Sequence, residues 1–445
     1  MIPFLAAAPG VIAAILLTIM PVEKVFYRLA LPVLILVPTY YYLNLPALPD
    51  LNFFHFALMP IFAWWLFKLC RDHHFSAMDL LVLLYVGLSL ISEFVNMGAK
   101  DGINLVINRS FQVVMPYLLM KHFFREPPTR IAIFKVLTLL GAVIAVLSLP
   151  QFKFDVSLVD PLALIWPEKL PWVSQARWGY VRVIATFTHA ILAGRMWAVC
   201  AFFALWLQRR RLWDDALLGW RFVLCNVAGM LMTISRGPIL GFLSGLAIFA
   251  VGLSMNRAQY FIIALFMAIL IIPPAAFQFK NYVAIDRFDA KTETQENAIY
   301  RWELLENYID VIREEPWLGY GIGNRPVVNN QDSVDNQFLY IGLLHGAVVM
   351  ALFIFMNLYS CLRLGLYAMR RPVTSGNGQL AWLLVGCNAT WLIPLATVWM
   401  GGQTEQMVFM LLAMGEALIG APEQSAATST EAQIPAMGLH AMRIL

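Results

Sequence analysis

Residues 260–277 read YFIIALFMAILIIPPAAF, a run without a single charged side chain. An α-helix needs about 20 mostly apolar residues to cross a hydrocarbon core of about 30 Å. Comparable runs recur from one end of the chain to the other. The quoted stretch therefore predicts a membrane span, and its counterparts predict a chain built mainly from such spans.

The composition of the whole chain agrees with this prediction. Of 445 residues, 60% are hydrophobic and 13% are charged, whereas an ordinary soluble domain is about 25% charged. The net charge is only +4, and no aromatic-basic module is visible, so nucleic acid is not an expected partner. The five cysteines have no C-x-x-C spacing, which indicates neither a disulfide framework nor a zinc site. The N-terminal MIPFLAAAPG has no basic region before its apolar run, so the first helix is expected to remain as a span.

Apolar runs separated by charged breaks predict an all-α polytopic membrane protein with about 12–13 transmembrane helices. The predicted spans are 4–20, 29–43, 53–69, 77–96, 102–121, 131–149, 183–207, 216–234, 238–253, 260–277, 336–362, 380–398 and 406–418. They form one transmembrane domain over residues 1–420. The tail, 421–445, is rich in Ala, Ser, Thr and Gln and is predicted to be a disordered cytoplasmic end.

Basic residues predict the orientation of these spans. Lys and Arg concentrate in one alternate set of loops, for example 209–211 and 370–371, which places that set in the cytoplasm. Two long loops, 151–182 and 280–335, then lie on the opposite, outer side. The first contains Trp166, Trp172 and Trp178 with several prolines and is expected to lie along the membrane interface. Within the second loop, apolar residues at helical spacing over 296–315 predict an amphipathic helix that Pro316 ends.

Four arginines are predicted on the outer side: Arg182, Arg195, Arg236 and Arg301. Each of them could pair with a nearby carboxylate or extend toward the membrane interface. Taken together they favour another role, because the planar guanidinium donates two hydrogen bonds at once and suits phosphate. A cluster of external arginines would therefore suit the head group of a lipid diphosphate.

An aspartate and two histidines are also considered as candidates for chemistry. Asp335 stands where the second long loop re-enters the membrane and could act as a general base. Alternatively, the pair Asp335 and Asn336 could only cap the following helix. His189, between Arg182 and Arg195, is a second candidate, whereas His345 is more typical of a packing residue. The histidines are not at metal-ligand spacing, so no metal or other cofactor is predicted.

The stretch 319–324, GYGIGN, is similar to a phosphate-binding glycine loop. No predicted strand precedes it and no helix opens directly from it, so a structural turn is the favoured interpretation.

Several of these residues together resemble the O-antigen ligase and polymerase superfamily. The resemblance is carried by Arg301-Trp302, by Pro316-Trp317-Leu318 followed by GYGIGN, and by Asp335-Asn336 with Gly346. The turn Ser235-Arg236-Gly237 and the Thr-Phe-Thr-His start of the seventh span match as well. The detailed resemblance covers roughly residues 177–346.

The resemblance implies a type C glycosyltransferase-like membrane fold with large periplasmic loops, located in the bacterial inner membrane. It also implies an undecaprenyl-diphosphate-linked saccharide donor, used without nucleotide sugar or metal, and diphosphate binding by Arg236 and Arg301. Ligases of the superfamily usually carry a histidine before the asparagine. Asp335 at that position favours an exopolysaccharide polymerase, and it leaves either Asp335 or His189 as the base.

The resulting prediction is a polymerase that joins undecaprenyl-diphosphate-linked oligosaccharides at the periplasmic face. Arg182, Arg195, Arg236 and Arg301 would bind the diphosphate, with Arg301 also assisting catalysis. Residues expected to position the acceptor or the loop are Asn336, Gly321, Asn324 and Glu306. Membrane lipid, a chain-length regulator and export proteins are expected partners.

Three alternatives stay open. The first is an O-antigen ligase that transfers glycan to lipid A core. The second is a lipid-linked oligosaccharide flippase or other transporter, which charges gathered at one face disfavour. The third is a non-catalytic scaffold in a secretion complex.

Overall fold

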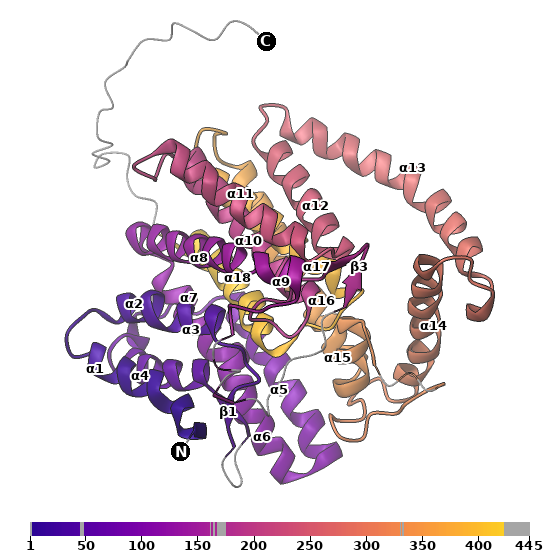
Figure 1. The fold of residues 1–445 in the computed structure, drawn as a ribbon, viewed down its shortest axis with the longest axis horizontal. Helices are drawn as coiled ribbons and strands as arrows, with labels where there is room; N and C mark the ends of the chain where they lie inside the picture. The colour runs from indigo at the N-terminus through magenta and orange to yellow at the C-terminus, as the bar shows by residue number, and fades with distance from the viewer. Residues whose placement is uncertain are drawn as a thin grey trace, which may run out of the picture.

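The computed structural model describes residues 2–44, 49–160, 162, 165–166, 175–329, 331 and 333–421, and the chain in these ranges is almost wholly helical (Figure 1). The described strands form two short antiparallel hairpins, β1 (Tyr42–Leu43) with β2 (Leu51–Asn52) and β3 (Ala176–Arg177) with β4 (Tyr180–Val181). The predicted all-α polytopic membrane fold is therefore confirmed. The predictions for Trp172 and for residues 422–445 fall outside the described residues.

Within the described residues, six helical segments are long and apolar enough to cross a membrane. They are α5 (Ala77–Met97), α8 (Pro127–Leu147) together with α9 (Leu149–Phe154), α10 (Ala190–Arg209), α13 (Arg257–Val283), α16 (Ala347–Met369) and α17 (Gly376–Leu395). Shorter apolar helices are α1 (Ala8–Leu16) with the 3-10 turn before it, α4 (Phe53–Lys68), α11 (Ala216–Met232) and α12 (Arg236–Gly252). The apolar run near the C-terminus is one helix, α18 (Gly402–Gly420), and other apolar runs are divided into shorter pieces.

Those divisions explain why the apolar runs predicted more spans than the six helical segments that are long and apolar enough to cross a membrane. The predicted span 102–121 is α6 (Ala99–Arg109), a π-helical turn η4 (Ser110–Val114) and α7 (Met115–Phe123). The predicted span 336–362 is α15 (Gln337–His345) and the start of α16, separated by Gly346 at φ +90°. The predicted span 29–43 contains the end of a π-helical turn, η2 (Phe26–Ala30), followed by α3 (Leu31–Leu36) and β1. Hydropathy detects an apolar run but not a break in the backbone inside it.

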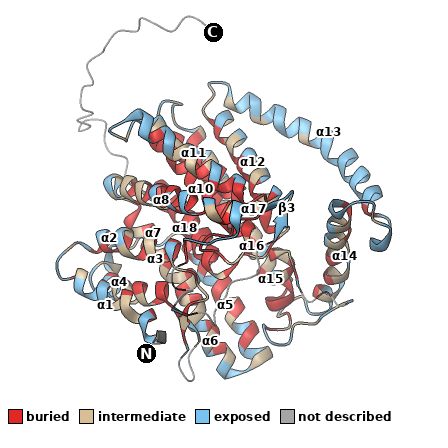
Figure 2. Cartoon of the chain, viewed as in Figure 1, coloured by how far each residue is buried: buried red, intermediate tan, exposed pale blue. Residues whose placement is uncertain are grey.

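Helix α13 shows most clearly that the outer surface of this protein is suited to contact with lipid. Its apolar segment has no buried residue, and Ile262, Leu265 and Ile269 are 62–69% exposed. Figure 2 shows α13 as a long exposed helix that stands apart from the bundle. In water such a surface would be a large apolar patch. In a bilayer it is covered by hydrocarbon, as expected for the stretch that predicted the fold.

The core of the bundle lies around α10 and α18 (Gly402–Gly420), in which nearly every residue is buried. Helix α12 packs on α17 through small residues four apart, Gly241 and Gly245. A Cβ atom on Gly245 would lie 2.4 Å from the carbonyl oxygen of Gly386. Only glycine permits this approach of two backbones, a common device between membrane helices. The contact fixes the position of Arg236, the first residue of α12.

The predicted amphipathic helix is present as α14 (Glu293–Glu314). Ile299, Tyr308 and Ile312 are buried as the spacing predicted, and Leu304 joins them. This face packs on Val334 and on α15. The helix ends two residues before Pro316, because the residue preceding a proline disfavours helical geometry. Helix α14 thereby lies beside the start of α15 (Figure 1).

Candidate functional site

The turn before α12 carries the first part of the site. Ile234 has a φ of +45°, a conformation that is unusual for a β-branched residue. Two arginines from the loop between α9 and α10 hold this turn. Arg182 donates to Gln175 Oε1 (2.9 Å), to Ser235 Oγ (2.9 Å) and to the Thr233 carbonyl (3.3 Å).

Arg177, on β3, donates to the carbonyl oxygen of Ile234 at 3.2 Å. Its guanidinium also lies 4.0 Å from the carboxylate of Glu293, which is 79% exposed. The β3–β4 hairpin thus attaches the outer loop to the strained turn. Arg177 was not among the predicted site residues. Its presence in the same aromatic-rich loop as Arg182 is the signal that could have identified it.

Arg236 follows the strained turn directly and is exposed. Its Nη2 donates to Thr294 Oγ1 at 3.2 Å. This bond joins the start of α12 to the start of α14. The side chain of Arg236 therefore lies where the bundle meets the amphipathic helix.

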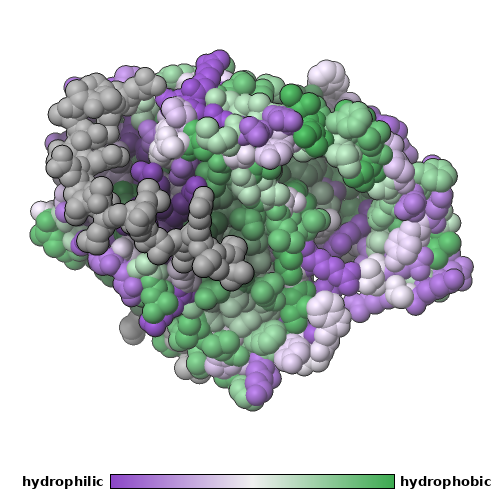
Figure 3. Space-filling model, turned by 90° about the horizontal axis from the view of Figure 1, so that it is seen from above, coloured by the Kyte–Doolittle hydropathy of each residue, from purple (hydrophilic) through white to green (hydrophobic). Residues whose placement is uncertain are grey.

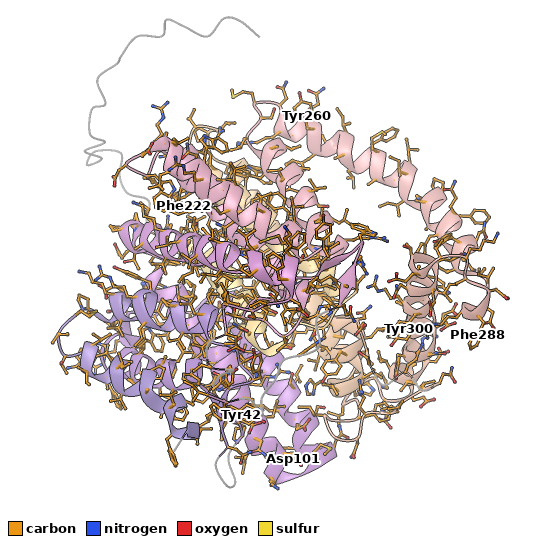
Figure 4. All side chains as sticks on the ribbon, viewed as in Figure 1. Tyr42, Asp101, Phe222, Tyr260, Phe288 and Tyr300 are labelled. Atoms are coloured by element: carbon orange, nitrogen blue, oxygen red, sulfur yellow. The ribbon has the colours of Figure 1, made fainter. Side chains whose placement is uncertain are left out.

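Arg301, on α14, completes the group. Its neighbour Tyr300 donates to the carbonyl oxygen of Ser333 at 2.9 Å, which holds α14 close to the segment that contains Asp335. Partial desolvation lowers the pKa of Arg301, the charge of Asp335 opposes that shift, and the charges of Arg177 and Arg236 reinforce it. Figure 4 labels Tyr300 on α14, whose neighbour is Arg301.

We call Arg177, Arg182, Arg236 and Arg301 the arginine cluster. Burial lowers the pKa of Arg182 to about 10, reinforced by the charges of Arg177 and Arg301. Arginine side chains do not lose their proton in proteins, so every member of the cluster carries a positive charge. The carboxylates that bear on them are Asp335 and Glu293, so positive charge is in excess.

His189 is the N-cap of α10, and its Nδ1 accepts the backbone N–H of Ile191 at 3.1 Å. Burial, reinforced by the charges of Arg182 and Arg195 and opposed by that of Asp335, lowers its pKa to about 4. The ring is therefore neutral at pH 7. Because Nδ1 accepts the cap hydrogen bond, the proton of the neutral ring is on Nε2, which makes that atom a donor.

Asp335 and Asn336 have separate tasks. Asn336 caps α15, its Oδ1 accepting the N–H groups of Phe338 (3.0 Å) and Leu339 (3.2 Å). Asp335 takes no part in the cap. It accepts a hydrogen bond from Ser333 Oγ at 2.7 Å, and its charge acts on both His189 and Arg301. The carboxylate is thus near enough to act electrostatically on both the histidine and the arginine cluster.

Arg195 lies apart from the cluster. Its side chain is 0% exposed, and its guanidinium carbon is 4.6 Å from the centre of the Trp391 ring. Its Nη2 donates to the Met400 carbonyl (3.1 Å) and to Thr404 Oγ1 (3.2 Å). These contacts hold α10 to α17 and α18, so in this structure Arg195 supports the helices around the site.

The glycine-rich turn also lies elsewhere. The N–H of Gly321, at φ +75°, donates to the Leu344 carbonyl, and the N–H of Ile322 donates to Glu93 at 3.1 Å. Asn324 donates to the Asn96 carbonyl at 3.3 Å. The turn therefore docks on the end of α5 rather than presenting its amides to a phosphate. Glu306 accepts a hydrogen bond from Trp302 Nε1 (2.7 Å) within α14.

The site as a whole can bind an anion at one end of the bundle. Four helices, α10, α12, α14 and α15, begin beside it, and helix N-termini carry partial positive charge. Figure 3 shows hydrophilic side chains gathered toward the side where α14 lies, next to a hollow in a mostly hydrophobic face. Arg236 and Arg301 are the exposed members of the cluster. The arrangement combines exposed guanidinium groups, the carboxylates of Asp335 and Glu293, and one neutral histidine.

Comparison with protein families identifies the region that contains this site. Residues 222–354 match the family described as O-antigen ligase. The match runs from α11 into α16 and includes Arg236, Arg301 and Asp335, while Arg182 and His189 lie before it. It confirms the predicted relation to the O-antigen ligase and polymerase superfamily. Among curated proteins, none matches the chain.

Proposed function

We propose that this protein is a metal-independent polysaccharide polymerase that joins undecaprenyl-diphosphate-linked oligosaccharides at the periplasmic face of the bacterial inner membrane. The observation that carries the proposal is the arginine cluster beside Asp335 and His189, at one end of a membrane helix bundle. The family match supports a lipid-linked oligosaccharide as substrate. The basic residues of the opposite loops support the orientation.

The arginines divide into two roles in this proposal. Arg236 and Arg301 are exposed and make contact with the diphosphate through paired N–H donors. Arg177 and Arg182 hold the strained turn under Arg236 and add positive charge. This division follows from their hydrogen bonds, because the guanidinium of Arg182 already donates to Gln175, Thr233 and Ser235.

The reaction exchanges one bond at the anomeric carbon of the donor glycan. A hydroxyl oxygen of the acceptor sugar forms a bond to that carbon, and the bond from the carbon to the diphosphate oxygen breaks. Asp335 takes the proton of the hydroxyl, and the diphosphate leaves with the bonding electron pair. The cluster stabilises the charge that develops on the departing oxygen, and such electrostatic stabilisation is usually the largest contribution to catalysis.

His189 is better placed as a donor than as the base. Its Nδ1 is occupied by the cap of α10, and its Nε2 carries the proton. Asp335 does not cap α15, and a carboxylate accepts hydrogen bonds rather than donating them. We therefore assign the role of base to Asp335 and the role of hydrogen-bond donor to His189.

The test uses purified protein in liposomes, with a native lipid-diphosphate repeat unit as the only sugar source. A ladder of lengthening lipid-linked glycan, formed without nucleotide or added metal and absent with the Asp335→Asn variant, is expected. Single units that stay unchanged in the presence of folded protein would overturn the proposal. Adding lipid A core in a parallel reaction separates ligation from polymerisation, because only ligation would attach glycan to that core.

A further inference from the structure

A second polar feature lies away from the arginine cluster. A cavity of about 460 Å³ is bounded by the β1–β2 hairpin, by α6 with η4, and by the first residue of α18. Its size falls within the range of about 300–1,000 Å³ of small-molecule sites. Of the described residues that line it, none is Lys or Arg. We call it the carboxamide cavity, after the side chains on its α6 wall.

That wall presents Asn104, Asn108 and Gln112, which are spaced four residues apart and therefore lie on one helix face. All three are half-buried. Within the described part of the chain, their side chains make no hydrogen bond to the protein. Each carboxamide offers two donors and one acceptor oxygen. Half-buried polar groups of this kind are stabilised by a ligand or by water that satisfies them.

His55 adds another polar side chain to the wall of the carboxamide cavity. It lines the same cavity, is 2% exposed, and stacks on Phe111 with ring centres 4.8 Å apart. Its Nδ1 accepts the N–H of Asn52 at 3.4 Å, so the neutral ring carries its proton on Nε2. That Nε2 is buried without a hydrogen-bond partner in the described structure.

The lining selects the chemistry of the ligand. A phosphate would meet Asp50 and no cation. An uncharged sugar fits better, because each hydroxyl both donates and accepts a hydrogen bond, as each carboxamide does. Tyr42 adds an aromatic ring to the wall, and Asp50 adds an acceptor. In Figure 4 the labelled Tyr42 lies well away from Tyr300, on the far side of α15 from α14.

One turn connects the cavity to the candidate active site. Gly402 lines the cavity, and two residues earlier the N–H of Met400 donates to Gln337 Oε1 at 2.6 Å. Gln337 follows Asp335 by two residues. Each two-residue step spans at most about 7 Å of extended chain. The hydrogen bond between Met400 and Gln337 therefore ties the cavity wall to the segment that carries Asp335.

We infer that the carboxamide cavity binds an uncharged sugar residue of the acceptor oligosaccharide and so directs its attacking hydroxyl toward Asp335. The inference rests on the proposed function for its assignment to the acceptor. The presence of a neutral-sugar site rests on the cavity alone. The two statements are therefore separable by experiment.

The test measures binding rather than turnover. Repeat-unit oligosaccharide, released by mild acid from the lipid-linked pool of the source cells, is titrated calorimetrically into the full-length protein in nanodiscs. The variant Asn104→Ala/Asn108→Ala is expected to bind it about tenfold more weakly or worse, since two hydrogen-bonding groups are lost. Asn281→Ala is the matched control, because Asn281 is an exposed helical asparagine near the end of α13.

A second titration, with undecaprenyl diphosphate that carries no sugar, checks the fold and the other site. Its affinity is expected to be the same in wild type and in the cavity variant. If the double variant loses this affinity as well, Gln112→Ala replaces it, since that side chain supports no hydrogen bond within the described protein. In turnover assays, the cavity variant is expected to raise KM for the acceptor with kcat nearly unchanged.

Oligosaccharide affinity that is equal in the cavity variant and the Asn281→Ala control overturns the inference, as does a wild-type protein that does not bind the oligosaccharide. The proposed function fails separately, if no polymer forms although both ligands bind. In that case a cavity-dependent loss of oligosaccharide affinity still supports a neutral-sugar site.

Discussion

Two arginine-containing regions of this protein differ in how their charge is balanced. In the arginine cluster, the side chains of Arg236 and Arg301 are exposed, and few carboxylates lie near them. Deeper in the bundle, Arg109 is 9% exposed and lies 2.5 Å from Glu405, with its other terminal nitrogen 3.5 Å from His345 Nε2. His345 is in turn 3.3 Å from Ser92 Oγ. This second group joins α6, α18, α15 and α5.

The difference indicates which charges are for structure and which are for a ligand. A buried ion pair must be complete, because either partner alone would be an uncompensated charge in a low-dielectric interior. The cluster, by contrast, has positive charge in excess, which suits the proposed binding of a diphosphate. Arg195 stands between the two cases, since it is buried but bonded to a carbonyl, a hydroxyl and an aromatic face.

The largest effect is expected from Asp335→Asn. Removing a general base lowers kcat by about 10²–10⁴-fold, while α15 keeps its cap because Asn336 is unchanged. Polymerisation rates in liposomes measure the loss, and the thermal midpoint in detergent checks the fold. Ser333→Ala, which removes only the hydrogen bond to the carboxylate, is expected to cost far less. A fully active Asp335→Asn variant would mean that the site has no base at this position.

Arg109→Ala should have its main effect on stability rather than on turnover. Leaving Glu405 unpaired is expected to destabilise the fold by about 3–5 kcal/mol, seen as a lower thermal midpoint and a lower yield of folded protein. The double change Arg109→Met/Glu405→Met should recover most of this loss, because two apolar side chains can replace a buried pair. Loss of activity in a fully stable Arg109→Ala variant would contradict the division between the two regions.

Arg301→Ala and Arg236→Ala should show the opposite pattern. Each is expected to lower kcat/KM by about 10²–10³-fold, the effect of removing one stabilising donor at a developing charge, with the thermal midpoint unchanged. Lysine at either position should retain part of the activity, because it keeps the charge and loses the planar fork. Arg313→Ala is the control, since that arginine is on the same helix, 75% exposed and paired with Asp310.

The smallest effect concerns the pH dependence of stability through His189. Its pKa is about 4 in the folded protein, against an ordinary value of 6.5. Between these values the unfolded chain binds more protons, so stability falls as pH falls from 6.5 to 4. Comparing wild type with His189→Gln across this range should show a smaller decrease of the thermal midpoint in the variant. Identical pH profiles would mean that burial does not depress the pKa of His189.

Much of the fold was predictable because it depends on local composition. The apolar run in α13, the turn before α12 and the amphipathic spacing of α14 are all visible along the chain. The site was partly predictable for the same reason: Arg236 and Asp335 stand at ends of predicted spans, and Arg301 lies on the predicted amphipathic helix of the outer loop. The sequence could not predict which side chains contact each other. Arg177 and the Arg109–Glu405 pair show this, because their contacts join residues far apart in the sequence.

By itself, then, the sequence determined that the chain is a bundle of membrane helices and which end of the bundle carries the candidate site, since hydrophobicity and basic-loop bias are properties of consecutive residues. Only the tertiary structure decided that Arg195 is buried under Trp391 while Arg301 is exposed, and that Asn336 rather than Asp335 caps α15. It also brought Asn104, Asn108 and Gln112 opposite the β1–β2 hairpin. The reason is physical: the energy of a charged or polar group depends on what surrounds it in space, and packing alone brings those surroundings together.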